Sequence, residues 1–203
     1  MVSPVTLESI PSLAEKFGGS LDSEGCEIWS RISIWKGDIT TLKVDAIANA
    51  ADEVLSGGGG VDGAIHKAAG PQLAEACRKL VGCETGKAKI TPGFNLPAKY
   101  VIHTVGPIGE KPGLLASAYY ESLDLAAKKG VRSIAFPCIS TGVFGYPARA
   151  ACIVAVQTVL KWIESHTDAI DRVVFCMFND RSIECYEETT ERLLAEKQQQ
   201  QEQ

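Results

Sequence analysis

Four consecutive glycines at 57–60 are followed by Asp62 and, one helical turn further on, by His66. Glycine tolerates positive φ and lets backbone N–H groups come close to a ligand, and a helix N-terminus favours anions. A glycine run between an apolar segment and a helix therefore indicates a phosphate cradle, although a flexible linker can also be rich in glycine. No Gly-Lys-Ser or Gly-Lys-Thr follows, and the glycines lack dinucleotide-fingerprint spacing, so neither of those phosphate motifs is indicated.

Two further loops carry residues suited to a ligand. Residues 140–145 are small except for Phe144, and they follow an apolar run that ends at Ile139. A tight loop should leave Phe144 near the surface beside a ligand, but Phe144 can also plug the loop against the domain. The third loop contains Asp38, which can bind a ligand or simply cap a turn.

The segments around these loops alternate between strand-like and helix-like patterns. Strands are expected at 26–36, 44–48, 87–91, 100–105, 131–136 and 173–178. Helices are expected at 5–17 with an interruption near Pro11, and at 62–69, 71–81, 114–129, 147–164 and 182–197. This alternation predicts an α/β fold with a mixed or mostly parallel sheet and helices on both faces. Ligands in such folds bind at the carboxyl ends of strands, and all three loops follow strands.

Length, composition and net charge limit the kinds of partner that the chain is expected to bind. The chain has 203 residues, which suits one domain, and 45% of them are hydrophobic, enough for a packed core. The formal net charge of −5, without a cluster of Lys or Arg, argues against duplex nucleic acid and anionic membranes. Because no apolar run is long enough to span a bilayer either, we expect no membrane or nucleic-acid partner.

The cysteines and the start of the chain bear on the compartment. Seven cysteines are scattered without a CxxC pair, and several lie in apolar runs. They are typical of small buried hydrophobes in a reducing compartment. The first thirty residues lack a basic-then-apolar signal pattern, so we expect a cytoplasmic and/or nuclear protein.

The histidines suggest neither a nucleophilic triad nor a metal site. His66 can support Asp62 from the next turn of the same helix, or it can be a packed structural residue. His103 lies within an expected strand and is assigned to the core. Since the sequence suggests no His/Cys cluster with tetrahedral ligands, we expect neither a metal nor a cofactor.

Several motifs, taken in order, resemble the macrodomain family. They are Gly37-Asp38-Ile39, the apolar run 44–51, the glycine run with 61–66, and 139–142. Residues 88–91 and 96–107 are similar to the MacroD-type subgroup. The resemblance covers about residues 31–190. We therefore expect a macrodomain at 26–197. The resemblance does not extend to the two ends, where the sequence pattern predicts a helical or linker extension at 1–25 and, because the run is polar and lacks periodicity, a disordered Gln-rich tail at 198–203.

The resemblance implies a three-layer α/β/α sandwich with a mixed six-stranded sheet and an ADP-ribose cleft across the strand ends. Asp38 would accept a hydrogen bond from the adenine amino group, Ile39 would line the adenine pocket, and Phe178 would pack on the ring. Phe144 would cover the distal ribose. The diphosphate would be clamped from two sides by Gly57, Gly58, Gly59, Gly60 and Val61 and by Ser140, Thr141, Gly142 and Val143.

The family also implies an activity. Asn49 would complete the binding site, and Asp52 and Asp62 would hold the distal ribose and a catalytic water. The chain would then be a hydrolase that removes mono-ADP-ribose from acidic side chains of proteins and deacetylates O-acetyl-ADP-ribose. We expect a monomer whose partners are ADP-ribose, O-acetyl-ADP-ribose and mono-ADP-ribosylated proteins. The alternatives are a non-catalytic ADP-ribose reader and, more distantly, a binder of RNA or nucleotide phosphates, against which the acidic balance argues.

One residue departs from the family pattern. The family usually has Asn-Ala-Ala-Asn, whereas this chain has Asp52 at the fourth position. Asn both donates and accepts hydrogen bonds, while an ionised Asp only accepts them. Ribose hydroxyls can donate, so Asp52 can still hold the sugar, and the departure bears on rate and affinity, not on the fold.

Overall fold

A computed structural model of the chain describes residues 3–17 and 23–201. Its elements in chain order are β1 (Val5–Thr6), η1 (Leu7–Ser9), α1 (Leu13–Phe17), α2 (Ser23–Ser30), β2 (Ile32–Lys36), η3 (Ile39–Thr41), β3 (Leu42–Lys43), β4 (Ala46–Ala50), α3 (Gly60–Ala69), α4 (Pro71–Lys79), β5 (Ala88–Pro92), β6 (Tyr100–Thr104), α5 (Pro112–Lys128), β7 (Ser133–Phe136), α6 (Ala148–Ser165), β8 (Arg172–Met177) and α7 (Asp180–Gln201).

A six-stranded sheet forms the centre of the fold, with the order β2-β8-β7-β4-β6-β5. Every neighbouring pair is parallel except β5 and β6, which are antiparallel. A separate parallel pair, β1 and β3, brings the N-terminal segment against the chain that follows η3. The mixed six-stranded sheet expected from the sequence is confirmed.

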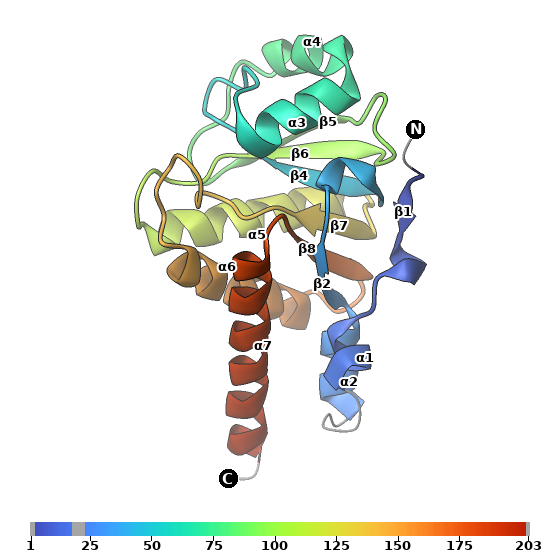
Figure 1. Cartoon of the computed structure of the whole chain (residues 1–203), viewed down its shortest axis with the longest axis vertical. Coiled ribbons are helices and arrows are strands. Elements are labelled where there is room, and N and C mark those ends of the chain that lie inside the picture. The colour runs from blue at the N-terminus through green and yellow to red at the C-terminus, as the bar shows by residue number, and fades with distance from the viewer. Residues whose placement is uncertain (1–2, 18–22, 202–203) are drawn as a thin grey trace.

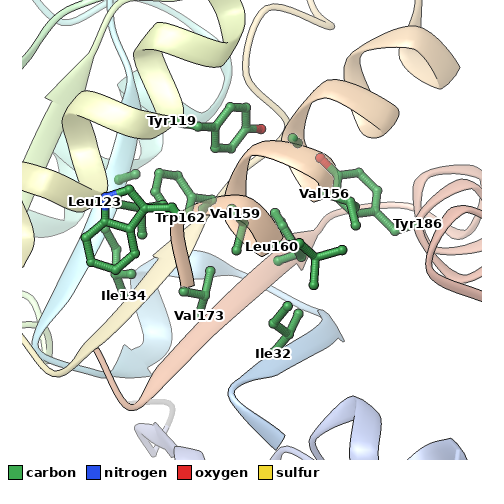
Figure 2. Close-up of a cluster of buried hydrophobic side chains, with 14 of the residues drawn as sticks. Ile32, Tyr119, Leu123, Ile134, Val156, Val159, Leu160, Trp162, Val173 and Tyr186 are labelled. Carbon is green, nitrogen blue, oxygen red and sulfur yellow. The ribbon is translucent and has the colours of Figure 1, made fainter. Parts of the chain in front are cut away.

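Helices cover both faces of the sheet (Figure 1). On one face, α1, α2, α5, α6 and α7 pack with the sheet around a core that includes the fully buried Trp162 and Phe175. Figure 2 shows part of this core, where Val156, Val159 and Trp162 meet side chains of the strands. On the other face, α3 and α4 pack over a second apolar cluster. Each large apolar side chain removed from water contributes roughly 1.5–3 kcal/mol, so these two clusters hold the three layers together.

The alternation of side chains along the central strands decides which residues face α3. Ala46 and Ala48 of β4 belong to the α5–α6 core, whereas Ile47 belongs to the cluster under α3 and α4. Because successive strand side chains point to opposite faces, Asn49 points the same way as Ile47, toward α3. The same argument places His103 of β6 on that face. Two buried polar side chains therefore lie beneath the start of α3.

The termini differ from the sequence expectations. Residues 26–30 were expected to be extended but belong to α2, and residues 5–17 form β1, η1 and α1 in place of one interrupted helix. Helix α7 continues to Gln201, whereas a disordered tail was expected at 198–203; residues 202 and 203 lie outside the described part of the chain. Glutamine is a good helix former, so a polar run can prolong a helix that is already anchored by packing. None of the described helices combines the length and apolarity needed to cross a membrane.

Candidate active site

A cleft of about 690 Å³ opens where the parallel strands end. Gly37 follows β2, Ala51 follows β4, Gly106 follows β6, Pro137 follows β7 and Phe178 follows β8, and all of them line the cleft. The site therefore lies at the carboxyl ends of the strands, as expected for an open α/β sheet.

Eleven of the sixteen residues assigned to the site from sequence line this cleft. They are Asp38, Ile39, Gly59, Gly60, Val61, Ser140, Thr141, Gly142, Val143, Phe144 and Phe178. The remaining five are Asn49, Asp52, Gly57, Gly58 and Asp62. Of these, Asn49, Gly58 and Asp62 are joined to one another behind the cleft wall, whereas Asp52 is engaged elsewhere.

One end of the cleft is formed by Asp38, Ile39 and Phe178. Asp38 Oδ1 accepts hydrogen bonds from the backbone N–H of Thr40 at 2.9 Å and from its hydroxyl at 2.7 Å, so Asp38 caps the short helix η3. The carboxylate is thus fixed in place at the edge of the cleft. Ile39 is buried and lines the cleft, and Phe178 is 83% exposed, which leaves a ring face free to stack on a planar ligand.

The glycine run leads from β4 into the first turn of α3. Gly57 and Gly60 have φ of +77° and +59°, a conformation that side chains other than glycine rarely adopt. These two positions turn the chain so that Gly59, Gly60 and Val61 face the cleft at the N-terminus of α3. Unpaired N–H groups at a helix N-terminus attract anions, so this wall of the cleft suits a phosphate.

Asp62 lies in that first turn and is only 6% exposed. Its Oδ2 accepts a hydrogen bond from Gly58 N at 2.6 Å, and its Oδ1 accepts one from Asn49 Nδ2 at 2.7 Å. His66 Nε2 lies 3.4 Å from the same Oδ1. The carboxylate thus ties the glycine loop, helix α3 and strand β4 together, and each oxygen keeps a lone pair for a further donor.

Asp52 has a different environment although it belongs to the same loop. Its Oδ1 accepts from Val54 N at 3.1 Å and from Ser56 N at 3.4 Å, and its Oδ2 accepts from the Ser56 hydroxyl at 3.2 Å. These bonds stabilise the turn before the glycines. The two carboxylates are therefore not equivalent: Asp62 is buried behind the cleft, and Asp52 supports its own loop.

The loop at 140–145 is held by backbone hydrogen bonds. Gly145 N donates to Gly142 O, Tyr146 N donates to Ser140 O, and Gly109 N donates to Phe144 O at 2.7 Å. Ser140 has φ of +67°, and its buried hydroxyl has no hydrogen-bond partner among the described residues. A strained residue with an unpaired polar atom in a cleft wall is often part of a binding site. Phe144 is half-buried and lines the cleft, so it does not plug the loop away from it.

Charged side chains and reactive thiols are scarce among the described residues that line the cleft. Among the described lining residues, Asp38 is the only one with a charged side chain. An anionic ligand would therefore be held by backbone N–H groups, not by Lys or Arg. Cys138 and Cys176 line the cleft, and burial raises the pKa of both thiols, that of Cys176 to about 12, so neither is a reactive thiolate.

Sequence reasoning missed a cluster of potential metal ligands. His66, Cys77 and His103 bring ligand-type atoms within 4.8 Å of one another from α3, α4 and β6. However, both ring nitrogens of His103 have hydrogen-bond partners, and burial with the nearby charge of Asp62 raises the pKa of the Cys77 thiol to about 11. Metals bind thiolates and unprotonated imidazole nitrogens. The donor set therefore favours a hydrogen-bonded cluster over a metal centre.

Other cleft residues were also absent from the sequence assignment. They are Gly37, Ala50, Ala51, Ala64, Gly106, Pro137, Cys138, Ile139, Cys176, Asn179 and Ser182. Several of them are small residues that directly follow a strand, and that position in the sequence could have marked them as candidate cleft residues. Gly106 is an example, because a Cβ there would lie 2.1 Å from Ser140 Oγ.

Comparison with known proteins agrees with this geometry. The macro domain family model matches residues 48–155. The chain is 52% identical over 197 residues to the ADP-ribose glycohydrolase MACROD2 of Xenopus laevis, covering 90% of this chain and 47% of that protein. It is 56% identical over 164 residues to the ADP-ribose glycohydrolase MACROD1 of Bos taurus, covering 78% of this chain and 50% of that protein. The chain thus spans about half the length of these two relatives.

A solved structure is similar over nearly the whole chain. The Trypanosoma brucei macrodomain in complex with ADP-ribose matches with a TM-score of 0.87 and 42% identity, over 94% of this chain and 78% of that one. The sheet order, the position of the cleft at the strand ends and the sequence similarity therefore support the same assignment. The chain belongs to the macrodomain family.

Proposed function

We propose that this chain binds ADP-ribose in the cleft and hydrolyses the bond between ADP-ribose and a protein carboxylate. The observation that carries the proposal is the pairing of a helix N-terminus that faces the cleft, at residues 59–61, with the buried carboxylate of Asp62 in the same turn. The relatives named ADP-ribose glycohydrolases and the similar macrodomain bound to ADP-ribose support it.

We propose one orientation for the ligand. Adenine stacks on Phe178 and donates its amino group to Asp38, the diphosphate lies between the N-terminus of α3 and the 140–145 loop, and the distal ribose lies near Phe144. This orientation brings the anomeric carbon toward Asn49 and Asp62. Asn49 Oδ1 is buried without a partner among the described residues, so a ribose hydroxyl that donates to it satisfies an unpaired acceptor.

The chemistry requires positioning more than strong acid–base catalysis. The bond from the anomeric carbon to the carboxylate oxygen breaks through an oxocarbenium-like state, and the carboxylate leaves as an anion without needing a proton. Water attacks the anomeric carbon, and its proton passes through the substrate's diphosphate to solvent. Asp62 accepts a hydrogen bond from that water and orients it. The products are ADP-ribose and the free carboxylate.

The same water position serves O-acetyl-ADP-ribose. Its ester lies on a ribose hydroxyl, so the reaction there is acyl transfer to water, not displacement at the anomeric carbon. The shared feature is the water between Asp62 and the diphosphate, while the transition states differ. We include this substrate in the proposal because it occupies the same cleft.

Calorimetric titration with ADP-ribose and release of ADP-ribose from an Asp/Glu-modified protein, measured on one preparation, test the proposal. Binding together with catalytic release is the expected result. Binding without release would make the chain an ADP-ribose reader. Absence of binding would reject the assignment of the cleft.

A further inference from the structure

Three neighbouring strands carry a line of buried polar side chains that ends at Asp62. His103 on β6 lies opposite Asn49 on β4 in the strand register, and both are fully buried. Asn49 Nδ2 is 3.2 Å from His103 Nδ1, and His103 Nε2 is 3.0 Å from Thr91 Oγ1 on β5. Together with the bond from Asn49 Nδ2 to Asp62 Oδ1, the line runs from Thr91 to the cleft wall.

The donors in this line determine where the protons are. The amide nitrogen of Asn49 has two hydrogens and no acceptor capacity; one hydrogen points to the Asp62 carboxylate and the other to His103. A flipped amide would place its oxygen 2.7 Å from the carboxylate oxygen, two acceptors facing each other, so the flip is excluded. His103 Nδ1 must therefore be unprotonated, and the ring proton is on Nε2, which faces Thr91 Oγ1.

The surroundings of His103 agree with a neutral ring. Burial, and then the charge of His66, lower the pKa of His103 to about 4. Cys77 Sγ lies 3.6 Å from Nε2, and its thiol remains protonated because burial and the charge of Asp62 raise its pKa to about 11. A ring with one proton on Nε2 and one free acceptor at Nδ1 is the state that this environment stabilises.

We infer that His103 is a positioning residue for the hydrolysis: its Nδ1 fixes the amide plane of Asn49, which in turn aims Asn49 Oδ1 at the distal ribose and holds Asp62. This inference rests on the proposed function. The terminal torsion of Asn is broad, so the amide plane is set by its partners, not by its rotamer. Without the acceptor at Nδ1, one amide hydrogen is left unpaired and the amide can turn away from Asp62.

Two substitutions of His103 distinguish the role of Nδ1 from that of Nε2. His103→Asn puts a carbonyl oxygen near the position of Nδ1 and keeps the acceptor for Asn49. His103→Gln reaches toward the position of Nε2 and loses that acceptor. Thr104→Val is the matched control, because Thr104 is the next residue on β6, is equally buried, and donates its hydroxyl to backbone oxygens of Lys87 and Ala118.

Single-turnover release of ADP-ribose from an Asp/Glu-modified protein is measured for each variant alongside its free energy of unfolding. Loss of one buried hydrogen bond that orients the site should slow His103→Gln about tenfold, with His103→Asn restoring most of the rate. Thr104→Val should lose stability without a slower release. Equal losses in the two His103 variants, or a His103→Gln rate equal to that of Thr104→Val, would overturn the inference.

The unsubstituted protein gives a test that does not depend on variant folding. Long-range ¹H–¹⁵N correlation identifies which ring nitrogen of His103 carries the proton, and we expect Nε2; a proton on Nδ1 would overturn the inference. If the chain released no ADP-ribose, the proposed function would fail separately. ADP-ribose affinity would then replace the rate, with weaker binding expected for His103→Gln than for His103→Asn, and equal affinities counting against the inference.

Discussion

Residues 51–59 connect β4 to α3, and residues 137–147 connect β7 to α6, so each loop leaves a buried parallel strand and enters a helix beside the cleft. The first loop and the start of α3 contain Asp52 and Asp62, whose side chains accept four hydrogen bonds from backbone N–H groups and the Ser56 hydroxyl of that loop. The second loop has no charged side chain and is closed by backbone hydrogen bonds. In the proposed complex, the start of α3 after the first loop supplies the Asp62 carboxylate, and the second loop supplies backbone groups and a phenyl ring around the ligand. A change of the Asp62 carboxylate should therefore alter the rate, and changes in the second loop should alter affinity.

Asp62→Asn should give the largest effect. The amide can still accept from Asn49, but its NH₂ group then faces the N–H of Gly58, and the water loses its acceptor. We expect the single-turnover rate of ADP-ribose release to fall by roughly 100-fold or more, in the range for removing a group that handles the reacting water. ADP-ribose affinity, measured by calorimetry, should change far less. A near-normal rate with bound ligand would remove Asp62 from the mechanism.

Acid should weaken the region beneath the first loop. The ring of His103 binds a proton near pH 6.5 in the unfolded chain but only near pH 4 in the folded protein, because burial lowers its pKa. Between these pH values the unfolded state holds more protons, so the free energy of unfolding falls as the pH falls, by about 3 kcal/mol in all. Urea unfolding at several pH values measures this slope, and His103→Asn should flatten it. An unchanged slope in that variant would assign the acid sensitivity to other groups.

Gly106→Ala tests the second loop. A Cβ there would lie 2.1 Å from Ser140 Oγ and 2.5 Å from Ile139 Cγ2, so the loop must shift. We expect ADP-ribose affinity to fall about tenfold, a change of about 1.4 kcal/mol, while the rate at saturation stays close to normal. Adding Ser140→Gly removes the hydroxyl and the left-handed strain, and should recover part of the affinity. A rate defect at saturation, without an affinity defect, would contradict the division between the loops.

Asp52→Asn should have the smallest effect. The Asn oxygen can keep the bonds from Val54 N and Ser56 N, and the new NH₂ group can donate to the Ser56 hydroxyl. We expect a change in stability below about 1 kcal/mol, typical of a substitution that preserves its hydrogen bonds. The release rate should stay close to that of the unsubstituted chain, because this side chain supports its own loop and does not line the cleft. A large loss of rate would make Asp52 a catalytic residue in its own right.

The sequence predicted the fold well where periodicity was strong. The alternation of apolar strands with amphipathic segments predicted a mixed or mostly parallel sheet with helices on both faces, and the resemblance to macrodomains implied its six strands. It failed at residues 26–30 because Ile28 and Ile32 are spaced equally well for a strand and for one turn of helix. In the structure, Trp29 of α2 packs edge-on against Phe17 of α1, with ring centroids 6.0 Å apart. This contact between two helices favours the helix at residues 26–30, and the local sequence pattern does not predict it.

The site was predicted less completely, for a related reason. Loops that follow strands were located because small residues and glycines mark them, and eleven of their residues do line the cleft. The different environments of Asp52 and Asp62 could not be predicted, since both are aspartates in one short segment. His103 was correctly assigned to the interior, but its link to Asn49 comes from the register of β4 and β6, which pairs residues far apart in the chain.

Release of ADP-ribose from an Asp/Glu-modified protein in H₂¹⁸O tests the central claim, that a water held at Asp62 attacks the anomeric carbon. We expect the chain to release ADP-ribose and the freed protein carboxylate, analysed by mass spectrometry of its peptide, to carry no ¹⁸O. Label in that carboxylate would mean that water attacks the acyl carbon, and an absence of release from bound substrate would mean that the cleft only binds. Either result would contradict attack on the anomeric carbon by a water held at Asp62.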